Sequence, residues 1–409
     1  MNKSFDVIIV GAGMVGASLA LLLRQYMSQG LSVALIDEHE ITATQAQQPS
    51  FDDRTTALSL GTQRIFESLS LWGTLAQAGC TIEHIQVSQQ GQFGRVRLHA
   101  KDEMVESLGS VIPNRAIGQV LSQGLLSCEP LSIFAPAKVE RYEMTQHGAR
   151  LHLAHAGKTV ELNAGLLVLA DGVSSVGCDQ LGIAQRRHDY NQSALICNVS
   201  FDRPHDHWAF ERFTLGGPLA LLPMQGNRFA LVWCMANEQA QAYLALDESE
   251  FNQRLQQAVG FDKGRITKSG DRASYPLVLS QAQEQVRSHL VVLGNAAHGL
   301  HPVAGQGFNL ALRDAKALAE NISQTWLQHG SSQLGHITHL LSYQAAQNQD
   351  QALTIGLSHH LPTQFAQAGV AWSLLRSLGL TVMDTLPAAK TVFARQAMGL
   401  VGAPAQWQP

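Results

Sequence analysis

The sequence predicts an α/β protein in which an antiparallel sheet is inserted into a parallel-sheet domain, with a helical segment at the C-terminus. Three observations carry this prediction. The chain opens with a strand, a glycine turn, a helix and a second strand; two later apolar runs each lead into a small-residue turn; and residues 192–274 contain period-two segments separated by turns. Buried parallel strands read as continuous apolar runs, whereas antiparallel strands alternate between apolar and polar residues.

Composition excludes several classes of protein. Of 409 residues, 45% are hydrophobic and 15% charged, which is too apolar for a disordered chain. The net charge is −4 with no basic block, so we expect no nucleic-acid partner. Five scattered cysteines indicate reduced thiols in a cytoplasmic protein, and no cluster has the spacing of a metal site. No run reaches the ~18 apolar residues of a membrane-spanning helix, which leaves peripheral membrane contact open.

The opening unit has strands at Phe5–Val10 and Leu31–Ile36 around a helix at Met14–Tyr26, which together make a βαβ unit. Its turn reads GxGxxG. Gly11 permits the tight turn, Gly13 lets the backbone approach a pyrophosphate, and Gly16 lets the helix pack closely on the strand. Asp37 ends the second strand and is placed to bind ribose hydroxyls. This arrangement predicts dinucleotide binding and does not separate NAD from FAD.

Two further turns follow buried strands. Asp171-Gly172 follows Leu166–Ala170, where a carboxylate and a close backbone approach suit pyrophosphate or ribityl groups; the alternative is an Asx turn that caps the next helix. Gly294-Asn295 follows Leu290–Leu293, and the segment His301–Asn309 then opens a helix with two glycines. Free N–H groups and the dipole there suit the negative N1–C2=O edge of a reduced flavin, although a glycine-rich helix start can also bind nothing.

The inserted sheet is indicated by alternating segments such as Arg228–Cys234. Pro223 and Trp233 in this sheet are candidate apolar lining residues of a ligand site, and Trp233 is more simply part of the core. Adjacent Glu211 and Arg212 are most simply an ordinary surface pair. No side-chain base stands out, and His298 and His301 are most simply loop histidines. From Ile355 onward only four residues are charged, which indicates helices that pack on the flavin domain or a surface for a partner or membrane.

The chain resembles the FAD-dependent aromatic hydroxylases of the p-hydroxybenzoate-hydroxylase type, and within them the ubiquinone-biosynthesis hydroxylases. The segment His301–Asp314 is similar to that family's signature, with Ala311 where Gly is usual, and Asp53-Arg54 matches its second conserved turn. The resemblance covers nearly the whole chain. It implies a Rossmann-like FAD-binding domain with an inserted antiparallel substrate domain and C-terminal helices.

The resemblance also implies residue roles. Flavin-environment residues, in place of a catalytic base, are Pro302, Gly305 and Gln306. Residues implied to hold FAD are Gly11, Gly13, Gly16, Asp37, Arg54, Arg115, Asp171, Gly172, Gly294, Asn295, Pro302, Gly305, Gln306, Gly307 and Asn309. Three positions depart from the family pattern: Asp37 replaces Glu, Asn295 replaces Asp, and Gly177 stands where Arg is common.

The implied domains are 1–75, 105–185 and 280–340 for FAD, 76–104 and 186–279 for substrate, and 341–409 for the C-terminal helices. The implied reaction hydroxylates a polyprenylated phenol with O2 through a flavin C4a-hydroperoxide, with NAD(P)H as transient electron donor. Other ubiquinone-biosynthesis proteins and the inner-membrane surface are candidate partners. The alternatives are another flavin-dependent aromatic hydroxylase or oxidase, and a non-catalytic carrier of prenylated ligands on the same fold.

Overall fold

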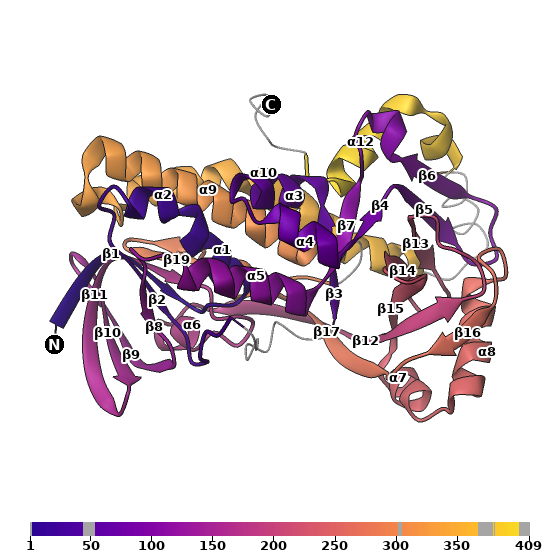
Figure 1. The fold of residues 1–409 in the computed structure, drawn as a ribbon, viewed down its shortest axis with the longest axis horizontal. Coiled ribbons are helices and arrows are strands. Elements are labelled where there is room, and N and C mark those ends of the chain that lie inside the picture. The colour runs from indigo at the N-terminus through magenta and orange to yellow at the C-terminus, as the bar shows by residue number, and fades with distance from the viewer. Residues whose placement is uncertain (1, 44–53, 302–304, 367–378, 380, 401–409) are drawn as a thin grey trace.

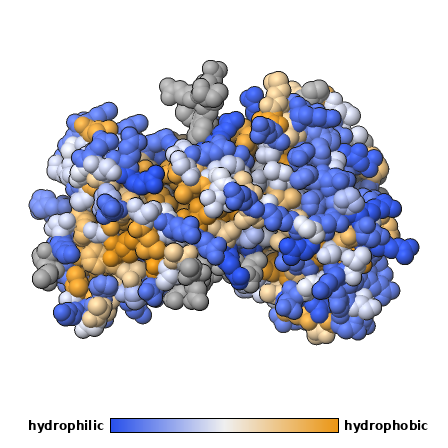
Figure 2. All heavy atoms as spheres, viewed as in Figure 1, coloured by the Kyte–Doolittle hydropathy of each residue, from blue (hydrophilic) through white to orange (hydrophobic). Residues whose placement is uncertain are grey.

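Three β-sheets organise the part of the chain that the computed structural model describes, residues 2–43, 54–301, 305–366, 379 and 381–400. An eight-stranded sheet with its helices forms one half of the molecule, a nine-stranded sheet forms most of the other half, and a three-stranded sheet lies between them (Figure 1). Figure 2 shows hydrophobic residues gathered on the half that holds α1 and α5, whereas the opposite half is largely hydrophilic on this face.

The eight-stranded sheet has the order β18-β19-β11-β1-β2-β8, with the β9–β10 hairpin added at β11. The strands β19, β11, β1, β2 and β8 pair in parallel, and their apolar side chains are almost fully buried. Their bounds are β1 (Asn2–Val10), β2 (Val33–Ile36), β8 (Ser132–Phe134), β9 (Ala137–Thr145), β10 (Gly148–His155), β11 (Lys158–Leu169), β18 (Val286–Arg287) and β19 (Leu290–Val292). All four predicted strands, Phe5–Val10, Leu31–Ile36, Leu166–Ala170 and Leu290–Leu293, therefore lie in the parallel part of one sheet.

Helices cover one face of this sheet because their apolar stripes bury against it. α1 contacts both α5 and α9, and α9 in turn contacts α10, so the four helices share one core. The helices of this half are α1 (Met14–Leu22), α2 (Arg24–Met27), α5 (Asn114–Leu126), α6 (Val176–Gln180), α9 (Gln306–His329) and α10 (Ile337–Ala366). The expected C-terminal helical segment is thus confirmed, and its first helix, α10, begins at Ile337.

The nine-stranded sheet has the order β20-β17-β12-β15-β14-β13-β5-β6, with β16 also paired to β12. Most of its pairs are antiparallel, as expected, but β13 pairs with β5 in parallel because β5 and β6 arrive from a segment more than 100 residues earlier. The bounds are β5 (His84–Gln89), β6 (Arg95–His99), β12 (Gln185–Phe201), β13 (Trp208–Phe213), β14 (Pro218–Met224), β15 (Arg228–Ala236), β16 (Ile266–Ser269), β17 (Ala273–Ala282) and β20 (His298–Gly299).

Two helices, α7 (Asn237–Leu244) and α8 (Glu248–Val259), pack on one side of this sheet and form a separate core with it. The three-stranded sheet consists of β3 (Thr55–Ser59), β7 (Gly109–Pro113) and β4 (Cys80–Ile82), in that order, and is flanked by α3 (Leu60–Ser68) and α4 (Trp72–Ala78). A C-terminal helix, α12 (Pro387–Ala397), returns to pack in one core with residues of β6 and β7. Among the described residues, no helix is both long enough and apolar enough to cross a bilayer.

Candidate functional site

A cavity of about 1430 Å³ runs between the eight-stranded and nine-stranded sheets. It exceeds the ~300–1,000 Å³ of a typical small-ligand pocket, so it suits a long ligand or two adjacent ligands. Its lining comes from the ends of β1, β2 and β11, from the turn after β19, and from β12, β15 and β17. The carboxyl ends of parallel strands are where ligands bind in such sheets, which makes this cavity the candidate active site.

The glycine turn at one end of the cavity is shaped by close backbone contacts. A Cβ on Gly16 would lie 1.9 Å from the carbonyl oxygen of Gly11, so α1 can begin here only with glycine at that position. Gly11 has a positive φ of 102°, and a Cβ there would meet the carbonyl oxygen of Ala170 at 2.4 Å. Gly11, Gly13 and Asp37 all line the cavity. The Asp37 carboxylate accepts hydrogen bonds from the backbone N–H groups of Ala12 and His39 at 2.6 and 2.7 Å.

The second turn places Asp171 and Gly172 in the same cavity. One oxygen of Asp171 accepts a hydrogen bond from the backbone N–H of Gly177, while the other oxygen is buried and has no partner within the described residues. Burial raises the pKa of Asp171, and hydrogen bonds from Ser175 and Gly177 oppose that shift. A Cβ on Gly172 would meet nothing within 4 Å, so open space lies beside this turn. An unsatisfied oxygen beside open space is what a hydroxyl-bearing ligand would complete.

The third turn brings Asn295 to the cavity, exposed on its surface. Gly294 and Gly305 both adopt left-handed backbone conformations with φ of 66° and 60°. Gly305 precedes α9, and Gln306 in its first turn donates a hydrogen bond to the carbonyl oxygen of Ala397. Pro302 lies outside the described residues. The region near Gly305 and Gly307 borders the cavity through Leu300 and Phe308.

Asn309 has a different role from the direct cofactor contact expected of it. Its carboxamide oxygen accepts from the N–H of Ser59 and the hydroxyl of Thr62, and its NH2 group donates to the carbonyl oxygens of Ala57 and Gly305. The side chain is buried and its hydrogen-bonding capacity is fully used by the protein. It therefore holds the start of α9 against β3 and leaves no donor or acceptor for a ligand.

Two predicted arginines lie at the margin of the site. Arg54 lines the cavity, and its guanidinium lies 4.9 Å from the ring centroid of Tyr275 on β17. This cation–π contact joins the segment before β3 to the nine-stranded sheet across the cavity. Arg115 is exposed on the first turn of α5 and is not among the lining residues, whereas its neighbour Asn114 is. Asn114 also accepts a hydrogen bond from Thr56 at 2.7 Å.

The nine-stranded sheet presents its inner face to the cavity. We use this name for the side of β12, β13, β14 and β15 that carries Ile196, Glu211, Ala220, Leu222 and Val232. Ile196 and Val232 line the cavity, and all five are partly accessible although their strands are central. On the opposite, outer face the side chains of Leu195, Leu219, Leu221, Leu231 and Trp233 are fully buried in the core with α8.

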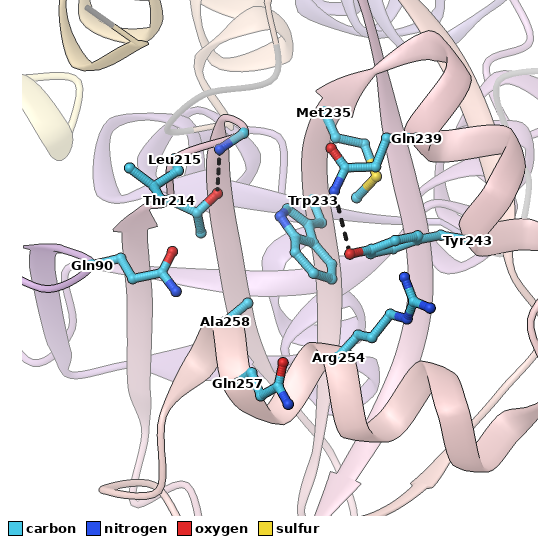
Figure 3. A pocket seen from close by; sticks show the side chains of 11 residues that line it. Gln90, Thr214, Leu215, Trp233, Met235, Gln239, Tyr243, Arg254, Gln257 and Ala258 are labelled. Atoms are coloured by element: carbon cyan, nitrogen blue, oxygen red, sulfur yellow. Dashed lines mark hydrogen bonds between the residues drawn. The ribbon is translucent and has the colours of Figure 1, made fainter. Parts of the chain in front are cut away.

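Trp233 therefore points away from the candidate cavity, which decides between its two expected roles in favour of the core. Figure 3 shows it on the outer face beside Tyr243 and Gln239, where a separate pocket of about 330 Å³ lies between the sheet and α8. Its ring centroid is 5.3 Å from that of Tyr243. The adjacent Val232, with the opposite orientation, lines the flavin cavity instead.

Several lining residues were missed by sequence reasoning. Asn114, Tyr275, Leu300 and Phe308 line the cavity, but no glycine turn or charge marks them in the sequence. Phe308 was within reach of prediction because it lies inside the signature segment, directly after Gly307.

The described residues contain no group of three or more His, Cys, Asp or Glu side chains placed to hold a metal ion.

These residues fit FAD. The first glycine turn and Asp37, the Asp171 carboxylate with its unsatisfied oxygen, Asn295, and Phe308 at the start of α9 all border this one cavity. A cavity that meets three strand ends in succession suits an extended dinucleotide. The fold and the site together define a dinucleotide-binding oxidoreductase.

Comparison with known proteins identifies the family. A family model described as an FAD binding domain matches residues 4–347. The ubiquinone hydroxylase UbiL of Rhodospirillum rubrum is 34% identical over 402 residues, covering 97% of this chain and 90% of that protein. The 3-demethoxyubiquinol 3-hydroxylase of Escherichia coli is 25% identical and covers 98% of this chain and 100% of its own length. The p-nitrophenol 4-monooxygenase structure from Pseudomonas putida superposes with a TM-score of 0.78 at 14% identity, covering 98% of this chain and 100% of that one.

The chain thus belongs to the FAD-dependent ubiquinone-biosynthesis hydroxylase family. It is an FAD-dependent aromatic monooxygenase, and the p-hydroxybenzoate-hydroxylase-like fold expected from the sequence is confirmed.

Proposed function

We propose that the protein hydroxylates the ring of a polyprenylated phenol, with O2 as oxidant and NAD(P)H as the source of electrons. The observation that carries this proposal is the inner face of the nine-stranded sheet, which is partly accessible and mostly apolar where it meets the candidate FAD cavity. An electron-rich ring held on this face would lie between the sheet and the flavin. FAD, when bound and reduced, would activate O2 and supply one oxygen atom to that ring.

The chain's own residues would bind, orient and dehydrate the reactants. Ile196, Val232 and Leu222 offer apolar contact to a ring and to the start of a prenyl tail. Burial of apolar surface contributes about 25 cal/mol per Å², so a long tail would supply much of the binding free energy. The same apolar lining excludes water, which protects a reactive flavin from unproductive decay.

The residue roles expected from the sequence become parts of this proposal. Gly11, Gly13, Gly16 and Asp37 hold the adenosine half of FAD, and Asp171 with Gly172 lies beside the pyrophosphate and ribityl groups. Asn295 meets the ribityl chain, and the segment from Gly305 to Gly307 meets the isoalloxazine. The start of α9 offers N–H groups there, and its dipole favours negative charge on the reduced ring.

The identity of the phenol is the finer part of the proposal. The segment Ala209–Cys234 and the pair Gly294-Asn295 are similar to those of the 2-octaprenyl-6-methoxyphenol hydroxylases. We therefore propose a substrate of that kind, with peripheral contact at the membrane that holds such prenylated molecules. The substrate domain is proposed as residues 76–104 and 186–279, the segments that supply β5, β6 and β12–β16.

The test begins with the absorption spectrum of the purified protein and identification of the chromophore released on denaturation. FAD near one per chain, NAD(P)H oxidation stimulated by a short-chain 2-prenylphenol, and a hydroxylated product detected by mass spectrometry would support the proposal. NAD(P)H oxidation that yields only hydrogen peroxide, with no hydroxylated ring across a series of prenylphenols, would favour an oxidase. A chain that purifies without flavin and takes up none would favour the prenyl-ligand carrier.

A further inference from the structure

Glu211 occupies a position that the sequence does not reveal. It lies on β13 directly opposite Ala220 of β14, which in turn lies opposite Val232 of β15, and Val232 lies opposite Ile196 of β12. Directly paired residues in a sheet project to the same side, so these four form one row across the inner face. Ile196 and Val232 line the candidate FAD cavity. The Glu211 carboxylate is therefore the acidic member of a row that runs out of the cavity.

A small side chain lies between Glu211 and the cavity along this row. Ala220 separates Glu211 from Val232, and it is partly accessible, as Glu211 is. Neighbouring strands lie about 4.8 Å apart, which places the Cα atoms of Glu211 and Val232 about 10 Å from each other. Between these two side chains the row therefore carries only a methyl group.

Arg212, the presumed partner of Glu211, lies on the other side of the sheet. Its guanidinium is close to Gly260, directly after α8 on the outer face. The expected surface pair is thus wrong, because successive residues of a strand project to opposite faces. Glu211 makes no hydrogen bond or ion pair with any described residue. The titratable group whose pKa responds to the Glu211 charge is Cys234 on β15.

Although Glu211 is partly accessible, partial desolvation raises its pKa to about 7, since no cation compensates for the water that the carboxylate loses. Cys234 does not oppose this rise in the pKa of Glu211. Burial and the Glu211 charge both raise the pKa of the Cys234 thiol, which therefore stays neutral. A carboxyl group with a pKa near 7 is matched to reversible proton transfer at neutral pH.

We propose that Glu211 is a catalytic residue that accepts the proton of the substrate's phenolic hydroxyl on the inner face. This inference rests on the proposed function and adds the base that the sequence lacked. The O–H bond breaks, its electron pair stays on the phenolic oxygen, and the proton forms an O–H bond with the Glu211 carboxylate. The resulting negative charge is delocalised to the ortho and para carbons. One of these carbons forms a C–O bond with an oxygen atom of the O2 that reduced FAD would activate, while the O–O bond breaks and the second oxygen atom leaves as water. The ring carbon then releases its own proton to solvent, and Glu211 returns its proton to the phenolic oxygen as the ring regains aromaticity.

The main test compares Glu211→Gln, which keeps size and hydrogen bonding but cannot take the proton, with Glu238→Gln on the exposed surface of α7. We expect FAD content and NAD(P)H-driven flavin reduction to be unchanged in both. General-base removal typically costs about 10²- to 10⁴-fold, so kcat for ring hydroxylation by Glu211→Gln should fall at least ~10²-fold with KM within about 3-fold. The O2 that Glu211→Gln consumes should then be released as hydrogen peroxide instead of entering the ring.

The pH profile separates a base from a structural residue. A base with a raised pKa is protonated and inactive below that pKa, so wild-type kcat should rise between pH 6 and 8 with a midpoint near 7. Glu211→Asp should keep this rising limb at a lower rate, and Glu211→Gln should lose it. If Glu211→Gln retains both the limb and the rate, the inference is overturned.

A measurement independent of turnover uses 4-nitrophenol, whose ionised form absorbs in the visible range. If its hydroxyl shares a proton with Glu211, the bound probe should titrate in two steps in the wild-type holoenzyme and in one step in Glu211→Gln. Identical one-step titrations in both proteins would overturn the inference. A two-step titration in an enzyme that hydroxylates no phenol would instead uphold the Glu211 contact and reject the proposed function.

Discussion

The side chain of Asn309 accepts a hydrogen bond from the backbone N–H of Ser59 at 3.0 Å, across 250 residues of sequence. The same oxygen accepts from Thr62 at 2.7 Å, so one carboxamide joins the end of β3, the start of α3 and the start of α9. Those three elements border the place where we propose the isoalloxazine. The helix start that faces the flavin is thus fixed by a residue that need not touch the flavin.

Replacement of Asn309 by Leu should lower both stability and FAD occupancy. The variant leaves the buried Ser59 N–H without its acceptor and takes away the acceptor of the Thr62 hydroxyl proton, and each unsatisfied group costs about 1–3 kcal/mol. Thermal unfolding of the holoprotein and FAD retention after gel filtration measure the two effects. Gln324→Ala, on the exposed side of the same helix, should change neither. Full FAD retention by Asn309→Leu would show that α9 does not depend on this junction.

Gly16→Val should strip FAD from the protein. Any Cβ at this position lies 1.9 Å from the Gly11 carbonyl oxygen, so α1 must move off β1 and carry its N-terminal N–H groups away from the cofactor. The flavin-to-protein absorbance ratio gives the readout. Gly73→Val is the matched control, since a Cβ there meets nothing within 4 Å. If the Gly16→Val protein retains its flavin, the adenosine half of FAD binds elsewhere.

Val232 and Trp233 are adjacent but should respond differently to substitution by Phe. Val232→Phe enlarges a side chain on the inner face, so we expect KM for a prenylphenol to rise about 10-fold or more while FAD stays bound. Trp233→Phe removes volume from the outer-face core, so we expect a lower unfolding midpoint and an unchanged KM. Steady-state kinetics and calorimetry on both variants check this. Equal effects on KM would contradict the assignment of faces.

Asp314 should make stability fall as pH rises. Burial raises its pKa to about 7 in the folded protein, well above the ordinary value of 3.8. Between these values the folded state holds the proton and the unfolded state does not, so stability decreases as pH rises through about 7 and levels off only above that value. Burial lowers the pKa of nearby His298 to about 4. This histidine opposes the trend only at pH values below its ordinary pKa of 6.5.

Asp314→Asn keeps an oxygen that can accept from Gln351 and removes the ionisation. We therefore expect the decrease in unfolding midpoint between pH 6.5 and 8 to be smaller in this variant than in the wild type. Differential scanning calorimetry at the two pH values gives the comparison. Glu320→Gln, an exposed carboxylate on the same helix, should retain the wild-type decrease. A wild-type decrease in Asp314→Asn would assign it to other groups.

The parallel sheet could be predicted from the sequence because its strands are buried on both faces and end at glycine turns. Leu166–Ala170 and Leu290–Leu293 leave little alternative to buried strands, and Asp171 and Asn295 then follow at the cavity. The orientation of the inserted sheet was not readable. The interpretation of Arg228–Cys234 as an alternating segment was wrong, because residues 229–235 are apolar at every position. No alternation in the sequence therefore tells which of Val232 and Trp233 faces the proposed flavin site.

The surroundings of Glu211 were predicted wrongly for the same reason, because the sequence does not show which face of the sheet this residue occupies. A Glu-Arg dipeptide is normally a solvated pair, and only the register with Ala220 and Val232 shows that the two side chains part to opposite faces. Asn309 was recognised as part of the signature, but its four partners come from segments that only folding brings together. Long-range contacts of this kind leave no periodic trace in a sequence.

The end of α12 has a consequence for how the enzyme is assembled on the ribosome. The backbone carbonyl of Met398 accepts from the N–H of Gly61, and that of Ala397 accepts from Gln306, so these late residues are fastened to the starts of α3 and α9. A nascent chain can form β1 and the glycine turn early, yet the starts of α3 and α9 lack these contacts until residue 398 has left the exit tunnel. Tight cofactor loading should therefore follow the docking of α12, and flavin retained by the purified protein reports that this helix has packed.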